Sequence, residues 1–277
     1  MVLNMTNLLL TTLVFTFLLP PKIEQPIDMP LWKAVVYANV IVIGKVTSLS
    51  ESDNSFTADF QITSILKGSS IKDDRKVTFY IEKHKSLLKN CLKQDCMVFL
   101  DDSHDSNWIF LLDWSKAIIN ISKETAFTQM VKQEILQQVT DVKKVHDYLN
   151  RNSLNEELTV KQFLVDIFDK EKVHKACDQL QTRDVSIAPA LIKYMDDRRV
   201  LPYPGLALNS PHVFDDGSVE GITHYSPDLV IDLLDTMLGV ITGAGSELYN
   251  EGTEEIRKER VFFWHVWLCH KQPVFCE

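Results

Sequence analysis

The chain has 277 residues, of which 45% are hydrophobic and 24% are charged, and its net charge is −9. These values are typical of globular domains and argue against a disordered chain or a protein with many membrane spans. The length suits about two domains. An acidic chain without a stripe of basic and aromatic residues also lacks the usual means of binding nucleic acid, so no nucleic-acid partner is expected.

An apolar stretch of twelve residues, interrupted only by three threonines, runs from Leu8 to Leu19 and ends at Pro20 and Pro21. It is shorter than the roughly 20 apolar residues that a membrane span needs, which favours the hydrophobic part of a signal peptide. We therefore expect residues 1–21 to be a signal peptide and the protein to be secreted or periplasmic. No Lys or Arg precedes the stretch, so an uncleaved anchor that holds the chain outside the cytoplasm is the alternative. Membrane contact is expected through this segment alone.

The part of the chain between residues 28 and 118 has the pattern of a small β domain. A short helix is expected from Pro30 to Ala38, with Asp28 as its cap. Short runs rich in Val, Ile, Phe and Thr follow, separated by turn-forming clusters, at residues 39–49, 56–68, 76–82, 96–102 and 107–114. Such runs predict a small antiparallel barrel or sandwich. The last two are expected to form a hairpin around Asp101 to Asn107, whose acidic tip we interpret as solvated because it lacks the glycine and distal glutamate of an EF-hand calcium loop.

From residue 122 to 277 the apolar residues recur with the period of a helix. One such stripe follows Thr159, which we expect to cap its helix. The stripes consist of Val160, Phe163, Leu164, Ile167 and Phe168, then Val173, Ala176, Cys177 and Leu180, then Ile187, Leu191, Ile192 and Met195. Short helices with one apolar face must pack on each other, as in a HEAT-like array; an irregular bundle is the alternative. Residues 201–221, with three prolines and three glycines, are expected to form a long loop. The fold class is therefore α+β.

Two resemblances follow from these residues. The stretches VIVIGKV (40–46), FQITSILKG (60–68) and CMVFL (96–100) resemble the OB-type barrels of netrin-like, or tissue-inhibitor-of-metalloproteinase-like, bacterial secreted proteins, over residues 30–115 or so. Inhibitors of that fold present an N-terminal cysteine to the zinc of their target. No cysteine precedes Cys91 here, so this chemistry is not carried over. Residues 190–202, 224–243 and 249–268 resemble the C-terminal part of uncharacterised bacterial HEAT-repeat-like proteins, which implies an architecture and no activity.

The five cysteines form two close pairs and a singleton. In an oxidising compartment a disulfide is expected between Cys91 and Cys96, and a second, less strongly indicated one between Cys269 and Cys276. Cys177 lies on an apolar helical face and is expected to be a buried thiol. Neither pair has the C-x2-C spacing of a zinc site, so no metal is expected.

One stretch, HYSPDLVIDLLDTMLGVITG (224–243), brings polar and aromatic groups together before an apolar run. We interpret Ser226 as an N-cap, Pro227 as the first helical residue and Gly243 as the residue that ends the helix. Positions 228, 232, 235, 239 and 242 would form its polar face. His224 and Tyr225 are interpreted as packing under the helix. The alternative is a catalytic cluster at the mouth of the preceding loop, made of His212, Asp215, Asp216, His224 and Tyr225.

The C-terminal helix carries His265 and His270, which are five residues apart and therefore point in different directions, so no shared metal is expected. Phe263, Trp264 and Trp267 are interpreted as core anchors. The chain contains no nucleophile elbow, Walker loop, dinucleotide fingerprint or zinc-protease motif. The expected function is thus that of an exported interaction protein with a protein partner, no catalytic residues and no cofactor. The alternatives are a hydrolase of unfamiliar type and a protease-inhibitor-like module.

Overall fold

The computed structural model describes residues 29–52, 55–68, 76–81, 91–102, 109–111, 117–121, 125–202, 208–213, 219–225, 227–244 and 253–277. The expected signal peptide (residues 1–21) and the expected cap Asp28 lie outside these ranges. Within them, none of the helices has the length and apolar character that crossing a membrane requires.

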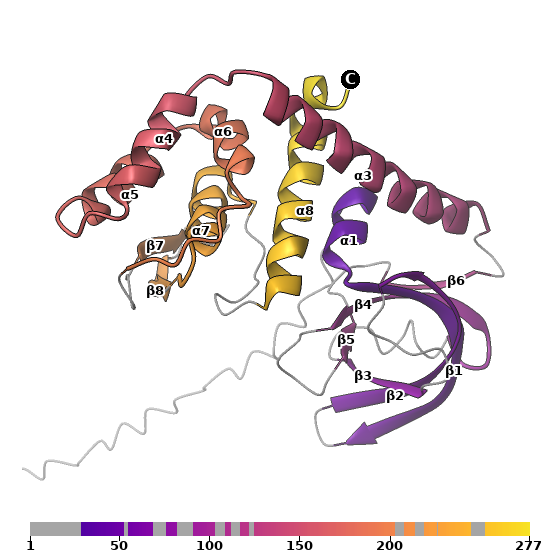
Figure 1. The fold of residues 1–277 in the computed structure, drawn as a ribbon. Coiled ribbons are helices and arrows are strands. Elements are labelled where there is room, and N and C mark those ends of the chain that lie inside the picture. Colours follow the sequence, from indigo (N-terminus) through magenta and orange to yellow (C-terminus); the bar gives the residue numbers. More distant parts are fainter. Residues whose placement is uncertain are drawn as a thin grey trace, which may run out of the picture.

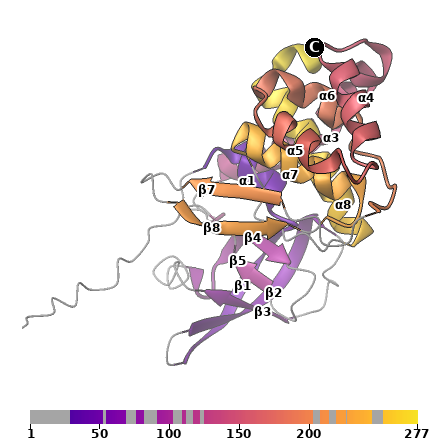
Figure 2. The same cartoon turned by 90° about the vertical axis from the view of Figure 1, so that its left-hand side faces the viewer.

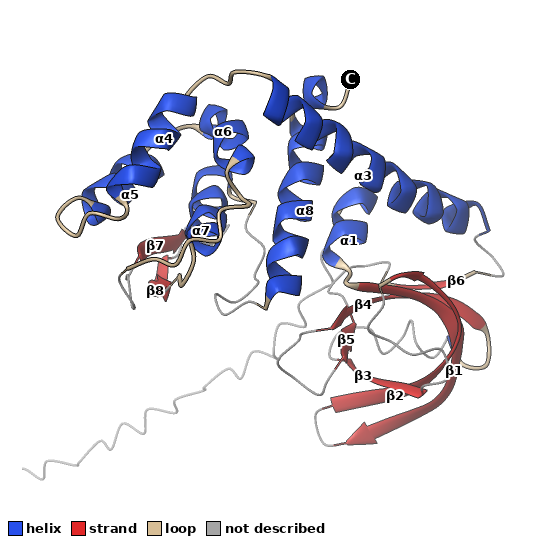
Figure 3. Cartoon of the chain, viewed as in Figure 1, coloured by secondary structure: helices blue, strands red, loops and turns tan. Residues whose placement is uncertain are grey.

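Strands gather in one part of the molecule and helices in the other, except that α1 lies over the sheet and one hairpin lies at the edge of the helical part (Figures 1 and 3). The fold is therefore mixed α+β, as predicted. In the first part the elements are α1 (Leu31–Tyr37), β1 (Val40–Ser52), β2 (Ser55–Lys67), β3 (Lys76–Ile81), β4 (Asp95–Asp102), β5 (Ile109–Leu111) and β6 (Ile118–Asn120). In the second part they are α3 (Thr125–Arg151), α4 (Glu157–Asp166), α5 (Val173–Gln181), η1 (Val185–Ile187), α6 (Ala188–Lys193), β7 (Leu208–Val213), β8 (Val219–Tyr225), α7 (Val230–Thr242), α8 (Glu254–Lys271) and η2 (Pro273–Phe275).

The first six strands form one sheet in the order β1-β2-β3-β5-β4-β6, and β1 also pairs with β4. The predicted hairpin of the last two strands is confirmed, because β4 pairs with β5 in antiparallel register. Two features differ from the expectation. Strand β3 runs parallel to β5, and a sixth strand, β6, pairs with β4. A three-residue strand such as β6 is too short to be predicted from its residue pattern.

The long strands β1 and β2 curve strongly (Figure 1). Their pairing has three register shifts, between Ile41 and Val42, between Ile43 and Gly44, and between Val46 and Ser48. Such irregularities bend a strand and increase its twist. Gly44 allows the closest approach, since a Cβ at this position would overlap the carbonyl oxygen of Gln61 and the ring of Phe60.

The helical stripes are confirmed by burial. Every member of the Val173 to Leu180 set is buried, and so are Val160, Phe163, Leu164 and Ile167, while Phe168 of the first stripe is partly buried. The expected cap is wrong, because α4 begins at Glu157 and Thr159 lies inside its first turn. The third stripe is also buried, although the chain there forms the short η1 and α6 in place of one helix.

The segment predicted as a long loop, residues 201–221, instead contributes β7 and the start of β8, which pair as an antiparallel hairpin. Figure 2 shows this hairpin outside the helical layers. The sequence has an Asp-Gly step at 216–217 between the two strands, a dipeptide that favours tight hairpin turns. The prolines and glycines of this segment are therefore compatible with a hairpin as well as with a loop.

Helix α1 belongs to both parts of the molecule. Ala34, Val35 and Ala38 are buried in the core of the sheet, whereas Val36 is buried in the core of the helices. The neighbouring Tyr37 stacks on Phe263 of α8, with ring centroids 5.2 Å apart. Because one short helix places two faces in two cores, the sheet and the helices share buried surface.

Helix α3 makes the second connection. Val131, near its start, is buried in the core of the sheet, while Val145 and Leu149, near its end, are buried in the helical core. The 27-residue helix thus runs across both parts (Figure 1). Its amide side chain Gln138 donates a hydrogen bond of 2.8 Å to the carbonyl oxygen of Trp32 in α1, which fixes the two connecting helices to each other.

Candidate functional site

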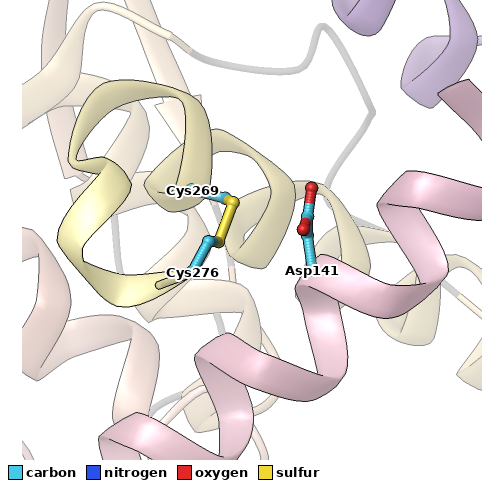
Figure 4. A group of neighbouring side chains, drawn as sticks. All are labelled: Asp141, Cys269 and Cys276. Carbon is cyan, nitrogen blue, oxygen red and sulfur yellow. A yellow bond between two sulfur atoms is a disulfide. The ribbon is translucent and has the colours of Figure 1, made fainter.

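Two cysteines and one carboxylate meet at the C-terminal end of the chain (Figure 4). Cys269 lies in the last turn of α8 and Cys276 in the terminal turn, and a disulfide joins them with 5.6 Å between the Cα atoms. The side chain of Asp141 in α3 lies beside the disulfide, and the three possible ligand atoms lie within 4.8 Å of one another. From the sequence, this disulfide was the less strongly indicated of the two, and nothing in the sequence associated Asp141 with it.

The surroundings of this disulfide do not favour a reactive thiolate. The carboxylate of Asp141 and the carboxyl end of α8 both bring negative charge to the sulfur atoms, and the ammonium of Lys144, which donates to the carbonyl oxygen of Cys276, lies at the edge of this group. Thiolates form readily where cations or the amino ends of helices predominate. Oxidation of the two thiols removes this conflict. The bond therefore acts as a structural link that fastens the terminal turn, with the buried Phe275, to the end of α8.

Cys91 and Cys96, predicted to form the more strongly indicated disulfide, are separate buried thiols in the structure. They are nonetheless neighbours. The thiol of Cys96 donates to the carbonyl oxygen of Cys91 over 3.8 Å, and the hydrogen bond between the two thiols lowers the pKa of Cys91 and raises that of Cys96. The tight turn that they enclose directs Cys96 to the carbonyl of Cys91.

The third free cysteine, Cys177, is buried on its helical face as predicted. Burial raises the pKa of its thiol to about 12, so it stays protonated and unreactive at neutral pH.

A largely buried ion network joins α7 to α8. The guanidinium of Arg260, with no exposed surface, lies 3.4 Å from Oδ1 of Asp232 and 3.4 Å from Oδ2 of Asp235. Arg257 donates two more hydrogen bonds to Asp232, at 3.0 and 2.9 Å, and Nε1 of Trp264 donates to Asp235 at 2.6 Å. The two positive charges balance the two negative charges, so each buried charge has a partner of opposite sign and the network has a structural role.

This network corrects the predicted polar face of α7. Positions 232 and 235 were expected on a polar face, but Asp232 and Asp235 are buried against α8. Burial raises the pKa of Asp235, opposed by the charge of Arg260. The signal was present in the sequence as Arg257 and Arg260 on the partner helix, but nothing in a single sequence pairs the two helices.

The start of α7 also differs from the prediction. The helix begins at Val230 and its N-cap is Leu229, so the expected cap Ser226, which lies outside the described residues, is three residues too early. Backbone atoms from a distant segment take its place. The amide of Val230 donates to the carbonyl oxygen of Arg199 at 3.0 Å, and the amide of Ile231 donates to the carbonyl oxygen of Asp197 at 3.1 Å. The carboxylate of Asp232 accepts a hydrogen bond from the amide of Leu229. Gly243 ends the helix in the left-handed conformation, as predicted.

The alternative catalytic cluster is partly outside the described residues, namely Asp215 and Asp216. His212 lies in β7, and His224 and Tyr225 lie in β8. The backbone register places His224 opposite Asn209 and His212 opposite Glu220. The two histidines therefore lie on different rungs of the hairpin.

The C-terminal helix matches its prediction. Phe263, Trp264 and Trp267 are buried, and the two histidines have different surroundings. His265 is buried and donates from Nδ1 to the carbonyl oxygen of Val261 at 2.6 Å; burial lowers its pKa. His270 stacks on Trp32 and lies 3.7 Å from Glu134.

One surface feature was not predicted. Leu136 and Val139 on α3 are 70% and 59% exposed. Exposed Lys132 and Lys143 lie one turn before and one turn after them, and the spacing of 4, 3 and 4 residues puts all four side chains on the same face of the helix. We call these four residues the α3 outer face. The signal in the sequence was an apolar pair on the side of α3 opposite to its buried residues.

No protein-family model matches the chain, and no curated protein matches its sequence.

Proposed function

We propose that this chain is an exported binding protein and that the α3 outer face is the surface on which it holds a protein partner. The observation that carries this proposal is the exposure of two neighbouring branched apolar side chains, Leu136 and Val139, on the side of a long helix that faces away from its buried residues. Clustered exposed apolar residues with a polar rim are typical of protein interaction sites. Both ends of α3 are anchored in a core, so the face is rigid before a partner arrives, which lowers the entropic cost of binding.

The charges on this face indicate the chemistry of the partner. The charged side chains of the α3 outer face are Lys132 and Lys143, both exposed, although the chain as a whole carries a net charge of −9. A basic rim around an apolar centre complements a segment with acidic residues on both sides of an apolar stripe. The proposed partner segment is therefore an acidic amphipathic helix.

Further observations support the rest of the proposal. The Cys269–Cys276 disulfide is typical of proteins in oxidising compartments, which agrees with a signal peptide in residues 1–21. Strand pairing runs β1-β2-β3-β5-β4 and returns from β4 to β1, with β3 parallel to β5, which supports an OB-like barrel for the first part. The short stacked helices support a HEAT-like second part. Intact-mass measurement of the protein from the cell envelope tests export; full-length protein in the cytosol would contradict it.

Binding is tested with a fluorescent, designed amphipathic helix that carries leucine on one face and glutamate on both sides of it. We expect anisotropy to report saturable binding that weakens as salt is raised. Leu136→Ser/Val139→Ser removes the apolar centre and Lys132→Glu/Lys143→Glu reverses the rim; each is expected to weaken binding at least about tenfold, which corresponds to roughly 1.4 kcal/mol.

The matched control is Leu158→Ser/Val165→Ser, which removes two equally exposed apolar side chains from α4. This variant is expected to bind the peptide like the unaltered protein. Equal loss in the α3 and α4 variants would contradict the assignment of the face, and so would binding that neither α3 variant reduces. Vesicles of anionic lipid are the comparison: binding to vesicles without binding to the peptide would point to a membrane surface and overturn the proposal.

A further inference from the structure

We propose that reduction of the Cys269–Cys276 disulfide converts the C-terminal cluster into a zinc site, with Cys269, Cys276 and Asp141 as its three protein ligands. This inference is independent of the proposed binding face, which lies on the opposite side of α3. It assigns a role to Asp141, a buried carboxylate that the disulfide alone does not explain.

The geometry is the first argument. The ligand atoms come from three elements, α3, α8 and the terminal turn, and already lie within 4.8 Å of one another. Zinc takes tetrahedral sites built from cysteine sulfur at about 2.3 Å and carboxylate oxygen at about 2.0–2.2 Å, so ligand atoms around one ion are separated by less than 4.8 Å. Figure 4 shows the carboxylate of Asp141 beside the disulfide. Once the disulfide is reduced, the two sulfurs must separate from bonding distance to enclose one ion.

The charge of the cluster is the second argument. Asp141 is only 5% exposed, and in the described part of the chain no Lys, Arg or His lies within ion-pair distance of its carboxylate. A buried carboxylate without a cation is costly, and bound cations are one of the ways in which proteins compensate it. Gln137 donates to Oδ1 of Asp141 at 2.6 Å, which holds the carboxylate in its orientation as supporting residues of metal sites do.

The surrounding charge also suits an occupied site. Zn²⁺ with two thiolates and one carboxylate has a net charge of −1. The ammonium of Lys144 donates to the carbonyl oxygen of Cys276 at 2.5 Å, so a compensating positive charge stands at the edge of the cluster. Three protein ligands leave the fourth position of the ion to water, which is the arrangement of an open zinc site.

A dithiol reductant transfers two electrons and two protons to the Cys269–Cys276 bond; the S–S bond breaks, two thiols form, and the dithiol becomes a disulfide. Zn²⁺ then displaces the two thiol protons, which pass to solvent, and binds the two thiolates. The negative surroundings that disfavour free thiolates stabilise the bound cation, so oxidised protein binds no metal at this place and reduced protein does.

The test uses the full chain carrying Cys91→Ser, Cys96→Ser and Cys177→Ser, so that Cys269 and Cys276 are the remaining cysteines. The protein is reduced with a phosphine, which competes weakly for metals, and titrated with Co²⁺ in the absence of oxygen. We expect one Co²⁺ per chain, with sulfur-to-cobalt charge-transfer absorption and the intense visible bands of tetrahedral cobalt, and displacement by Zn²⁺. The oxidised protein is expected to give none of these bands.

Asp141→Asn is expected to weaken Co²⁺ binding at least about tenfold, the lower end of the loss seen even for supporting residues of metal sites. Asp147→Asn, a change at a half-exposed carboxylate of the same helix, is the matched control and should leave the titration unchanged. Circular dichroism of each reduced variant verifies that it is folded. A folded, reduced protein that binds no Co²⁺ would overturn the proposal. So would unchanged binding in Asp141→Asn, or the same spectrum in a chain that also carries Cys269→Ser and Cys276→Ser.

Discussion

At the scale of single residues, the most demanding feature is the buried network of Arg257, Arg260, Asp232 and Asp235. A buried ion pair gains little over apolar packing, but removal of one partner leaves the other charge without compensation. Asp232 accepts from both arginines and from the amide at the start of α7, so it is the member whose loss exposes most unpaired groups.

We therefore predict that Asp232→Ala lowers the free energy of unfolding by about 3–5 kcal/mol, measured by urea denaturation. Asp169→Ala is the control, because the ion pair of Asp169 with Lys172 lies at the surface and is expected to contribute almost nothing. Similar stabilities for the two variants would show that the network is not buried.

Lys67 gives a prediction about pH. Its ammonium donates to the carbonyl oxygens of Val35 and Val36 at the end of α1, at 2.7 and 3.2 Å, beside the ring of Phe262. Burial lowers the pKa of this amine from 10.5 to about 8, and the charge of Glu259 opposes the change. Between these values the unfolded chain keeps a proton that the folded chain has released.

Because the unfolded state binds more protons in this range, the contribution of Lys67 makes the free energy of unfolding rise from about pH 8 to about pH 10.5. Below pH 8 both states are protonated and the contribution is constant. Denaturation at several pH values should show that Lys67→Met loses this rise, whereas Lys45→Met, a change at an exposed lysine, retains it. The opposite slope, or an equal slope in both variants, would contradict the burial of the amine.

At the scale of elements, glycine is required at two positions for different reasons: lack of space for a side chain at Gly44 and a left-handed backbone conformation at Gly243. A Cβ at Gly44 would overlap backbone atoms of Gln61, whereas a Cβ at Gly243 would meet no atom within 4 Å but would occupy the left-handed conformation, at φ 63°. We predict that Gly243→Ala costs about 1–2 kcal/mol and that Gly44→Ala costs more, because strands β1 and β2 must separate. Thermal denaturation of the two variants gives the comparison, and a smaller loss at Gly44 would contradict the close approach of the strands.

The elements also show what a single sequence allows. Stripes such as Val173 to Leu180, the hairpin of β4 and β5 and the aromatic anchors of α8 were predictable, because local periodicity and turn residues determine them. The start of α7 was not, since the carbonyls of Asp197 and Arg199 take the role assigned to Ser226. The hairpin of β7 and β8 was not predictable, because prolines and glycines are typical of loops as well as of hairpins.

At the scale of the whole molecule, α1 and α3 connect two cores, and neither connection could be read from periodicity. Val35 and Val36 are adjacent in the sequence but lie in different cores, and the Asp141 cluster joins residues more than a hundred positions apart. Such contacts depend on how elements pack, and a single sequence carries no direct record of that packing.

This sharing of α1 predicts a single cooperative unfolding transition for the unaltered protein, with equal calorimetric and van't Hoff enthalpies. Tyr37→Ala, which removes the stacking on Phe263, is expected to weaken the coupling and to broaden or split the transition. Tyr148→Ala removes an aromatic contact with Phe275 inside the helical part and serves as the control. Two separate transitions in the unaltered protein would show that the two parts are independent.

The proposal that the α3 outer face binds an acidic amphipathic segment is tested most directly by photocrosslinking in the cells that produce the protein. A benzophenone amino acid replaces Leu136 in one variant and the equally exposed Leu158 of α4 in another. The account predicts an adduct at position 136, absent at position 158, whose crosslinked peptide, read by mass spectrometry, is an acidic segment with an apolar stripe. A lipid adduct at position 136, a basic or wholly apolar crosslinked peptide, or equal adducts at both positions would contradict it.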